Sequence, residues 1–299
     1  EISECLVGSE MCIRDRSNIL FYKVFTIKNL TSLEIDLHLY MGWRVFMKEL
    51  NEKVAIITGA GQGIGKGIAL HLGKRGVKVV CVGRRLDPIV QTVKEVEEAG
   101  GQGFAITCDV GNREDVKKVV KATVEKYGTV DVVVNNAQSL PGSAKVEDTT
   151  YEQMLTAWQS GTIGSLNMMQ ECFPYMKDQN EGRIINFASA TGMFGYAGQL
   201  AYGCNKESIR GLTKIAAKEW AQYNIIVNCV LPGAESPAAK VWAAKFPEKY
   251  KEIMEAQPMK RFGDGEDDIG RVIAFLAGPD SKYYTGQCLL VDGGYSIAP

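Results

Sequence analysis

The stretch K53-V-A-I-I-T-G-A-G-Q-G-I-G-K-G67 places an apolar, β-branched run directly before a glycine-rich loop. The run predicts a buried strand, and the helical pattern that follows the loop reaches Lys74. Glycines permit the tight turn and let the backbone approach a pyrophosphate at the positive end of a helix. A glycine turn without a ligand is the alternative. We expect a dinucleotide to contact Gly59, Gln62, Gly63, Ile64 and Gly65.

The alternation of strand and helix patterns continues along the chain. Apolar runs recur at 77–83, 103–110, 130–137, 182–189, 225–233 and 288–294. Helical patterns lie between them at about 86–99, 114–127, 150–176 and 202–222. Strands that are apolar throughout, each followed by a crossover helix, predict an α/β fold. The expected architecture is a Rossmann-type, doubly wound parallel sheet in a single domain.

Composition limits the class of partner. Of 299 residues, 45% are hydrophobic, and 34 basic residues balance 35 acidic ones. We therefore expect a small-molecule partner, with no nucleic acid and no membrane. The eight cysteines lack C-x-x-C spacing, which predicts reduced, buried thiols in a cytoplasmic protein, without disulfides or a metal site. His71 lies in a helical run and is expected to be a satisfied or solvent-facing histidine, not a catalytic one.

The first 46 residues differ from the rest. The stretch L6-V-G-S-E-M-C-I-R-D-R16 matches one reading frame of a transposase adapter used in DNA sequencing libraries. We therefore expect residues 1–16 to be translated adapter. Residues 17–46 fit neither a signal peptide nor a spanning helix. We expect residues 1–46 to be a non-native or disordered extension and residues 47–299 to form the domain, with a genuine amphipathic extension as the alternative.

A second stretch, S189-A-T-G-M-F-G-Y-A-G-Q-L-A-Y202-G-C-N-K206, sets three chemical groups at fixed distances. Tyr202 and Lys206 are four residues apart, so on a helix they share one face. A free phenol has a pKa of about 10, and a nearby ammonium and a cationic nicotinamide both favour the phenolate. Such a phenol can transfer a proton to or from the carbonyl oxygen of a substrate. Ser189 ends a predicted strand, and its hydroxyl can donate a hydrogen bond to the same oxygen. We expect Ser189, Tyr202 and Lys206 to be catalytic.

The second predicted strand ends in G83-R-R-L-D87. A small residue followed by arginine leaves room and positive charge for a 2′-phosphate, so Gly83 and Arg84 favour NADP. NAD is the alternative, because Asp87 could hold the ribose hydroxyls or the arginines could be solvated surface residues.

Residues 47–299 resemble the short-chain dehydrogenase/reductase family. The resemblance rests on the glycine loop, D109-V110, N135-N-A137, Ser189, Tyr202, Lys206 and P232-G233. It implies that Asp109 and Val110 border the adenine, Asn136 and Ala137 the ribose, and Pro232 and Gly233 the nicotinamide. It also implies that Tyr202 is the acid/base, that Lys206 holds the ribose and lowers the tyrosine pKa, and that Ser189 orients the carbonyl. A homodimer or homotetramer would form through residues 150–176, 202–222 and 289–291.

Two residues depart from the family pattern. Gln138 stands where a glycine usually follows N-N-A, and Gly161 stands where an asparagine usually begins Asn-x-x-Gly. That asparagine belongs to the proton relay from lysine to solvent. A backbone carbonyl can hold the relay water, and Gly161 with Gly164 permits a local helix irregularity. We expect an altered relay.

The expected activity is NAD(P)H-dependent interconversion of a secondary alcohol and a ketone. Trp242, Phe246, Tyr250, Ile253 and Met254 recur at helical spacing, as an apolar substrate lid or as a stripe packed on the sheet. Segments such as I-I-N-F-A-S-A-T-G-M-F-G-Y-A-G-Q and G-P-D-S-K-Y-Y-T-G resemble bacterial bile-acid hydroxysteroid dehydrogenases of the 12α type. The glycine loop lacks an insertion associated with that type. A 3-oxoacyl thioester reductase and a catalytically silent dinucleotide-binding regulator are the alternatives.

Overall fold

The computed structural model describes residues 14–15, 18–19, 50–235 and 243–297. The chain divides into two compact units, residues 1–46 and 47–299. In the first unit, β1 (Arg14–Asp15) and β2 (Asn18–Ile19) pair antiparallel. The remaining residues of the predicted extension lie outside the described residues, so the adapter origin and the non-native character of this segment stay predictions.

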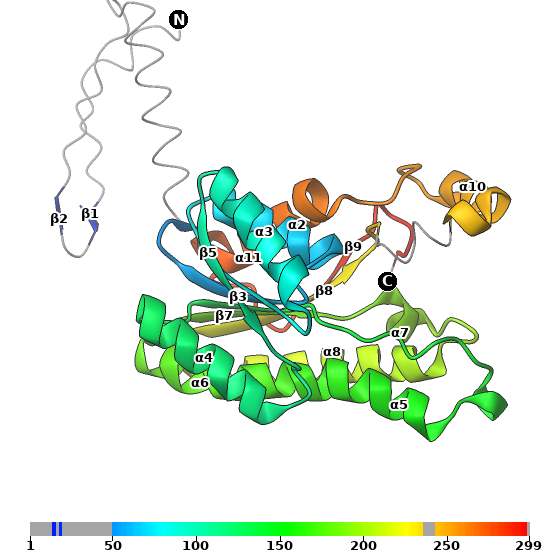
Figure 1. Cartoon of the computed structure of the whole chain (residues 1–299), viewed down its shortest axis with the longest axis horizontal. Helices are drawn as coiled ribbons and strands as arrows, with labels where there is room; N and C mark the ends of the chain where they lie inside the picture. Colours follow the sequence, from blue (N-terminus) through cyan, green and yellow to red (C-terminus); the bar gives the residue numbers. More distant parts are fainter. Residues whose placement is uncertain (1–13, 16–17, 20–49, 236–242, 298–299) are drawn as a thin grey trace, which may run out of the picture. The chain divides into compact units, whose positions relative to one another are not determined.

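The second unit is built on a seven-stranded parallel sheet (Figure 1). The strand order is β5-β4-β3-β6-β7-β8-β9, so the order reverses between β3 and β6. The strands are β3 (Val54–Thr58), β4 (Lys78–Gly83), β5 (Gln102–Thr107), β6 (Val132–Asn135), β7 (Gly182–Phe187), β8 (Ile225–Pro232) and β9 (Cys288–Val291). Strands β3, β6 and β7 are buried along their whole length. The predicted Rossmann-type, doubly wound parallel sheet is confirmed.

Helices cover both faces of this sheet (Figure 1). One face carries α2 (Gly63–Lys74), α3 (Leu86–Glu98) and α11 (Arg271–Ala277), and the other carries α4 (Arg113–Tyr127), α6 (Gly164–Asp178) and α8 (Leu200–Trp220). Successive side chains of a strand point to opposite faces. Ile57 therefore packs with Leu72 in one core, whereas Ile56 packs with Met168 in the other.

The single helix predicted near 150–176 is interrupted. The structure has α5 (Tyr151–Trp158), a π-helical turn η3 (Gln159–Ile163) and then α6. The irregularity expected at Gly161 and Gly164 is confirmed, while a continuous helix is wrong. The shorter elements are α7 (Ala190–Phe194), α10 (Pro247–Ala256), the π turn η5 (Gly265–Gly270), and the 3-10 turns η2 (Val146–Asp148), η4 (Ala221–Tyr223) and η6 (Pro279–Ser281).

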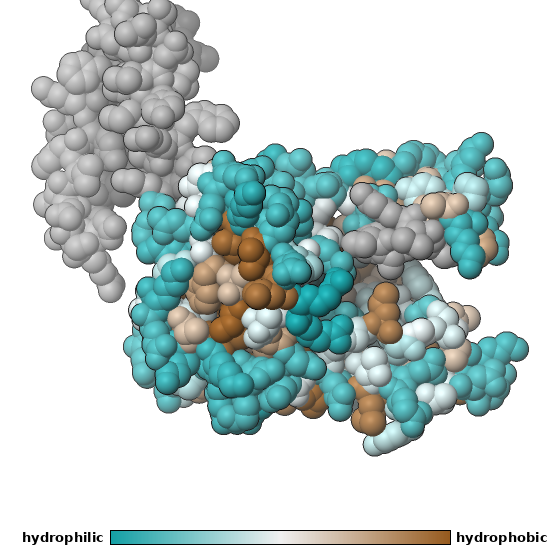
Figure 2. Space-filling view, in the orientation of Figure 1, coloured by the Kyte–Doolittle hydropathy of each residue, from teal (hydrophilic) through white to brown (hydrophobic). Residues whose placement is uncertain are grey.

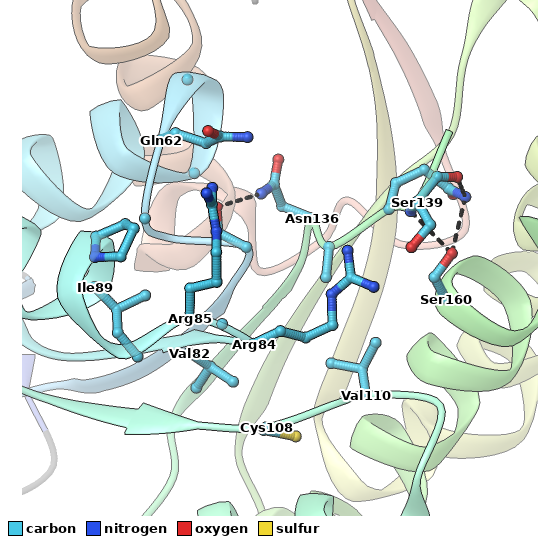
Figure 3. A pocket seen from close by; sticks show the side chains of 18 of the residues that line it. Gln62, Val82, Arg84, Arg85, Ile89, Cys108, Val110, Asn136, Ser139 and Ser160 are labelled. Atoms are coloured by element: carbon cyan, nitrogen blue, oxygen red, sulfur yellow. Dashed lines mark hydrogen bonds between the residues drawn. The ribbon is translucent and has the colours of Figure 1, made fainter. Parts of the chain in front are cut away.

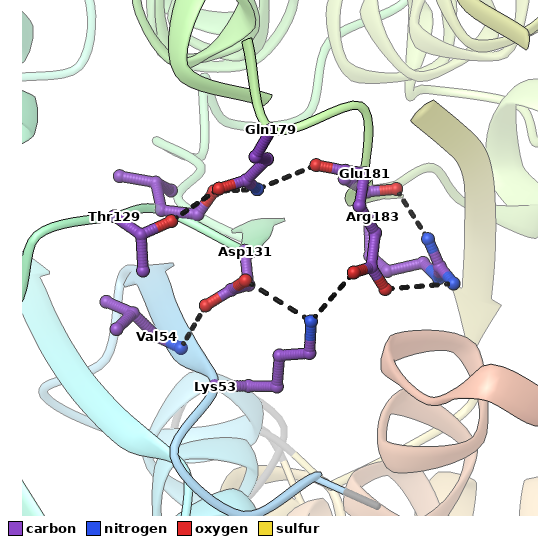
Figure 4. A network of polar contacts seen from close by, with 9 residues as sticks. Lys53, Val54, Thr129, Asp131, Gln179, Glu181 and Arg183 are labelled. Carbon is purple, nitrogen blue, oxygen red and sulfur yellow. Dashed lines mark hydrogen bonds and ion pairs between the residues drawn. The ribbon is translucent and has the colours of Figure 1, made fainter. Parts of the chain in front are cut away.

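A polar network fastens the amino-terminal ends of the central strands (Figure 4). The Nζ atom of Lys53 lies 3.3 Å from a carboxylate oxygen of Asp131 and 3.0 Å from one of Glu181. The other oxygen of Asp131 accepts the backbone N–H of Val54 over 2.8 Å. Arg183 is buried and pairs with Glu181 over 3.6 Å. These contacts join the starts of β3, β6 and β7 at the end of the sheet opposite to the carboxyl ends of the strands.

The surface of this unit is not uniformly polar. Figure 2 shows hydrophobic side chains between α3 and α4, over the edge strand β5. The half-buried Phe104 and Ile106 belong to this strand. In the described part of the chain, no helix combines the length and the hydrophobicity that crossing a membrane requires.

Two predictions for single residues are wrong. Cys204 is exposed, because its position on α8 faces away from the sheet, while Cys81, Cys108, Cys172 and Cys229 are buried as expected. His71 is neither solvent-facing nor satisfied: α2 packs against η5, which buries the ring and leaves Nε2 without a hydrogen-bond partner among the described residues.

Candidate active site

A cleft of about 660 Å³ opens at the carboxyl ends of β3, β4, β5 and β6 (Figure 3). It lies at the point where the strand order reverses, which is where doubly wound sheets bind their ligands. Its lining includes most of the residues predicted from the sequence. These are Gly59, Gln62, Gly63, Ile64, Gly65, Arg84, Asp109, Val110, Asn136, Ala137 and Tyr202. Ser189, Lys206, Pro232 and Gly233 do not line it.

The glycine loop after β3 is held closely against the loop after β6. Gly59 has a φ of 69°, which favours glycine. The side-chain amide of Asn136 donates to the carbonyl of Thr58 over 2.8 Å, and the hydroxyl of Thr58 accepts the backbone N–H of Asn136 over 3.0 Å. A Cβ atom on residue 65 would lie 2.5 Å from Nδ2 of Asn136. The Asn136 side chain therefore braces the glycine loop.

The first turn of α2 faces this cleft and suits an anionic group. Gly63, Ile64 and Gly65 all line the cleft, and the first N–H groups of a helix have no partner within it. The first turn carries no acidic residue. The positive end of the helix dipole adds to the attraction for a phosphate. The absence of side chains at 63 and 65 and the unpaired amides fit the pyrophosphate of a dinucleotide.

Two arginines flank the other side of the cleft. Arg84 and Arg85 follow β4, are exposed, and line the cleft, with Arg85 directed toward Gln62 and Arg84 toward the β6 side in Figure 3. Neither forms an ion pair with another described residue. Asp87, the alternative partner for a ribose, lies in the first turn of α3 and does not line the cleft.

Tyr202 and Lys206 lie one turn apart near the start of α8. Tyr202 lines the cleft, whereas Lys206 is buried behind it. The Nζ atom of Lys206 lies 5.7 Å from the centre of the Tyr202 ring and donates to the carbonyl of Phe187 over 2.6 Å. This carbonyl ends β7, so the lysine ties α8 to the sheet beneath the tyrosine.

Ser189 follows β7 and caps α7. Its hydroxyl accepts the backbone N–H of Thr191 over 3.2 Å and lies close enough to Tyr202 to favour the ionised phenol, which opposes the rise in the tyrosine pKa. The serine and the phenol are therefore adjacent, as their predicted roles require.

Burial shifts the pKa values of both Tyr202 and Lys206. Desolvation raises the pKa of Tyr202 above its usual value, despite an opposing effect of the Ser189 hydroxyl. Desolvation also lowers the pKa of Lys206 to about 7. The protein residues alone therefore do not produce the depressed tyrosine pKa implied by the family resemblance, because the lysine is only partly charged near neutral pH. In the structure, the surrounding protein therefore favours the neutral phenol, which is the proton-donating form of Tyr202.

The sequence analysis did not predict the residues after β6 that form one wall of the cleft. Gln138, Ser139, Leu140 and Ser160 line the cleft together with Arg85 and Cys108. Gln138 had one signal, its departure from the family pattern, but that departure did not indicate what the side chain contacts. Ser160 belongs to the π turn, whose place in the cleft wall follows from the fold.

Comparison with known proteins shows the family to which the chain belongs. A family model described as enoyl-(acyl carrier protein) reductase matches residues 59–296. The chain is 38% identical over 254 residues to a 12alpha-hydroxysteroid dehydrogenase of a Clostridium species, covering 83% of this chain and 98% of that protein. The chain belongs to the short-chain dehydrogenase/reductase family. It is also 37% identical over 250 residues to a 3-oxoacyl-(acyl-carrier-protein) reductase of Thermotoga maritima, covering 83% and 99% of the two chains.

Solved structures of this family have the same fold. Levodione reductase matches with a TM-score of 0.79 at 27% identity, over 83% of this chain and 99% of that one. Xylitol dehydrogenase bound to NAD+ matches with a TM-score of 0.77 at 31% identity, over 83% and 100%. A variant of actinorhodin polyketide ketoreductase with NADPH has a TM-score of 0.77 at 32% identity, over 82% and 98%. The predicted activity is confirmed at this level: the short-chain dehydrogenase/reductase is an NAD(P)-dependent oxidoreductase that interconverts a secondary alcohol and a ketone.

Proposed function

We propose that this enzyme reduces the ketone of a bulky, apolar alicyclic compound of the steroid class, with NADPH as the preferred cofactor. The observation that carries the proposal is the position of Tyr202, which lines the dinucleotide cleft with Ser189 beside it and Lys206 buried one turn away.

The roles of the three side chains follow from this arrangement. When bound, the nicotinamide of the cofactor would supply the hydride that reduces the carbonyl carbon. The phenol of Tyr202 gives its proton to the carbonyl oxygen, and the Ser189 hydroxyl donates a hydrogen bond to the same oxygen as negative charge develops there. Lys206, when charged, stabilises the phenolate that Tyr202 becomes. In the direction of alcohol oxidation, the phenolate accepts the proton instead.

Different residues along the cleft would hold different parts of the cofactor. The amides of Gly63, Ile64 and Gly65 would receive the pyrophosphate. Asp109 and Val110 would border the adenine and Ala137 the ribose, at the ends of β5 and β6. Pro232 and Gly233 end β8, where the N–H of Gly233 donates to the carbonyl of Val291 over 2.9 Å. We assign this last pair to the nicotinamide on the family resemblance.

Arg84 and Arg85 support NADPH. Two exposed guanidinium groups without an ion-pair partner in the described chain stand at the end of β4, where the ribose 2′ position of a dinucleotide lies in this fold. A 2′-phosphate would form charge-assisted hydrogen bonds with them, which are stronger than those to neutral hydroxyls.

Apolar surface near Tyr202 supports a bulky substrate. Leu140 is exposed and lines the cleft, and Phe194 and Tyr196 are exposed on and just after α7. A bridge between Ala144 and Gln199 holds these two segments side by side. None of the residues of α10 is buried, which favours the lid over a stripe packed on the sheet; Trp242 lies outside the described residues. The 12alpha-hydroxysteroid dehydrogenase relative agrees with a steroid ketone.

The Thermotoga relative, at nearly the same identity, makes a 3-oxoacyl thioester the second candidate substrate. A silent regulator is disfavoured because a dinucleotide sensor has no need for the Ser189, Tyr202 and Lys206 arrangement.

The deciding experiment follows absorbance at 340 nm with the full chain, using NADPH and separately NADH. The panel contains 12-oxo and other oxo bile acids, decalones and acetoacetyl thioesters. Turnover of an oxo bile acid, with higher kcat/KM for NADPH, is the expected result. Tyr202→Phe should lose at least a hundredfold in kcat while its NADPH affinity, read by fluorescence, stays within twofold. Full activity of Tyr202→Phe would refute the proposed chemistry, and turnover of the thioester alone would replace the substrate class.

Assembly and location stay predictions. The exposed side chains of Tyr151, Leu155 and Trp158 follow one another along α5 at helical spacing. We propose that they contribute to a homodimer or homotetramer, which light scattering during gel filtration would measure. A cytoplasmic location is proposed on the composition alone.

A further inference from the structure

Asn205 is completely buried on α8, directly before Lys206. Its side-chain oxygen accepts the backbone N–H of Thr162 over 2.9 Å and the Thr162 hydroxyl over 2.8 Å. Its side-chain nitrogen donates to Oε1 of Gln138 over 2.8 Å. Buried carboxamides are retained at little cost only when they are paired in this way. Both ends of this carboxamide therefore have a defined partner.

The partner on one side is the π turn η3. Thr162 lies inside this turn, and a side chain from another helix satisfies its N–H. The hydroxyl of Thr162 is also hydrogen-bonded to Ser208, one turn further along α8. The interruption between α5 and α6 is thus held by α8 at the level of Lys206.

The partner on the other side is the wall of the cleft. Gln138 lines the cleft, and its side-chain nitrogen donates to the carbonyl of Ser139 over 2.9 Å and to the Ser160 hydroxyl over 3.2 Å. The Ser160 hydroxyl in turn accepts the N–H of Ser139 over 2.9 Å (Figure 3). One continuous set of hydrogen bonds therefore runs from the catalytic helix through Asn205 to the loop that follows β6.

Gly161 leaves the space that Asn205 fills. A Cβ atom on residue 161 would lie 2.7 Å from Cγ of Asn205 and would contact both terminal atoms of the carboxamide still more closely. Non-bonded carbon atoms in contact are normally about 3.5–4.0 Å apart, well above this distance. A side chain at 161 and the present Asn205 conformation therefore exclude each other.

We propose that Asn205 is a positioning residue for the Tyr202 and Lys206 pair, and that its carboxamide couples α8 to the π turn and the cleft wall only because residue 161 has no side chain. The inference rests on the proposed function of Tyr202. Because Asn205 lies between Tyr202 and Lys206 on one helix, loss of its contacts changes how the phenol and the ammonium face the cleft.

The first test is Asn205→Ala, assayed with NADPH and the panel ketone of highest kcat/KM. We expect kcat to fall by about ten- to a hundredfold, since small displacements of a reacting group have effects of this size. The midpoint of the pH profile of kcat should also move by about 0.5 pH units or more, a readout that a change in stability alone does not produce. NADPH affinity should stay within twofold. An unchanged kcat and pH profile would overturn the proposal.

The second test does not depend on folding of Asn205→Ala. In a helix, alanine is normally favoured over glycine. Gly211→Ala on α8, where a Cβ meets nothing within 4 Å, is the matched control and should keep its kcat. Gly161→Ala should instead lose at least tenfold in kcat, because the new methyl displaces the carboxamide. Equal behaviour of the two alanine variants would overturn the proposal.

The third test is the exchange of positions, Gly161→Asn with Asn205→Ala. If the two side chains compete for one space, the double variant should recover at least tenfold in kcat over Gly161→Asn alone. Additive losses would contradict competition for that space. Tyr202→Phe in the same assay separates the two proposals: an active Tyr202→Phe refutes the proposed function, whereas an inactive Tyr202→Phe beside a normal Asn205→Ala refutes only the role of Asn205.

Discussion

The side-chain amide of Asn136 donates a 2.8 Å hydrogen bond to the backbone carbonyl of Thr58, and so fastens the end of β6 to the start of the glycine loop. These are the two strands between which the sheet order reverses. The contact makes the floor of the cleft a single unit, in which the glycine loop cannot move without the loop that carries Ala137 and Gln138.

The close packing of this unit predicts the effect of Gly65→Ala. The added Cβ would lie 2.5 Å from Nδ2 of Asn136 and would also meet the carbonyl of Gly59. Relief requires the loop to move, at about 1–3 kcal/mol, which corresponds to about a ten- to hundredfold weaker affinity for NADPH. Fluorescence titration measures this affinity. Gly211→Ala should bind NADPH normally, and a Gly65→Ala protein with unchanged affinity would contradict the packing argument.

Arg84→Ala should change the choice of cofactor. Loss of a hydrogen bond to a charged group is worth about 1.5–3 kcal/mol, so kcat/KM with NADPH should fall by about tenfold or more while the value with NADH changes little. Arg113→Ala, on the exposed side of α4 and paired with Glu171, is the control for loss of an arginine. Equal effects of Arg84→Ala on both cofactors would indicate that Arg84 is a solvated surface residue that does not select the cofactor.

Asp131→Ala should lower stability without affecting the cleft. The substitution leaves the N–H of Val54 and one side of Lys53 without their partner at the far end of the sheet. Unpaired buried groups of this kind cost about 1–3 kcal/mol, which urea unfolding would report. NADPH affinity should be unchanged. Glu147→Ala, which removes an exposed pair with Lys145, should leave the urea midpoint where it was.

His71 predicts a loss of stability in acid. Burial, and then the positive charges of Arg75 and Arg271, lower its pKa below the usual 6.5, against a smaller opposing effect of Glu266 and Asp267. The unfolded chain therefore binds more protons than the folded one between the two pKa values, so stability is full above pH 6.5 and declines as the pH falls below it. Urea midpoints at pH 7.5 and 5.5 should differ less in His71→Gln than in the natural sequence; an identical difference would point to other groups.

Much of the cleft follows from local sequence patterns. The glycine loop, the arginines after β4 and the residues after β5 and β6 each lie at the end of an apolar run, and parallel strands bring such ends to one edge. The predicted cofactor residues of these four strands accordingly meet in the cleft. Tyr202 joins them because α8 begins beside β7.

Other features depend on contacts between distant segments. Gln138 and Asn205 are 67 positions apart, and neither sequence neighbourhood indicates that their carboxamides meet. The pKa values of Tyr202 and Lys206 likewise depend on burial, which the four-residue spacing does not reveal. His71 was misjudged for the same reason, since η5, some 195 residues downstream, is what buries it.

The π turn between α5 and α6 has a consequence for how the chain tolerates insertions and deletions. A π turn accommodates one residue more than an α-helical turn, and one residue corresponds to about 100° of rotation around the axis. The apolar stripe of α6, which includes Met168 and Met176, is therefore out of phase with that of α5 unless the extra residue is present. Removing any one residue from 159–163 would rotate the far end of the helix away from its core, whereas a substitution would not. The length of the segment is therefore constrained at each of its positions, in addition to the requirement for glycine at position 161.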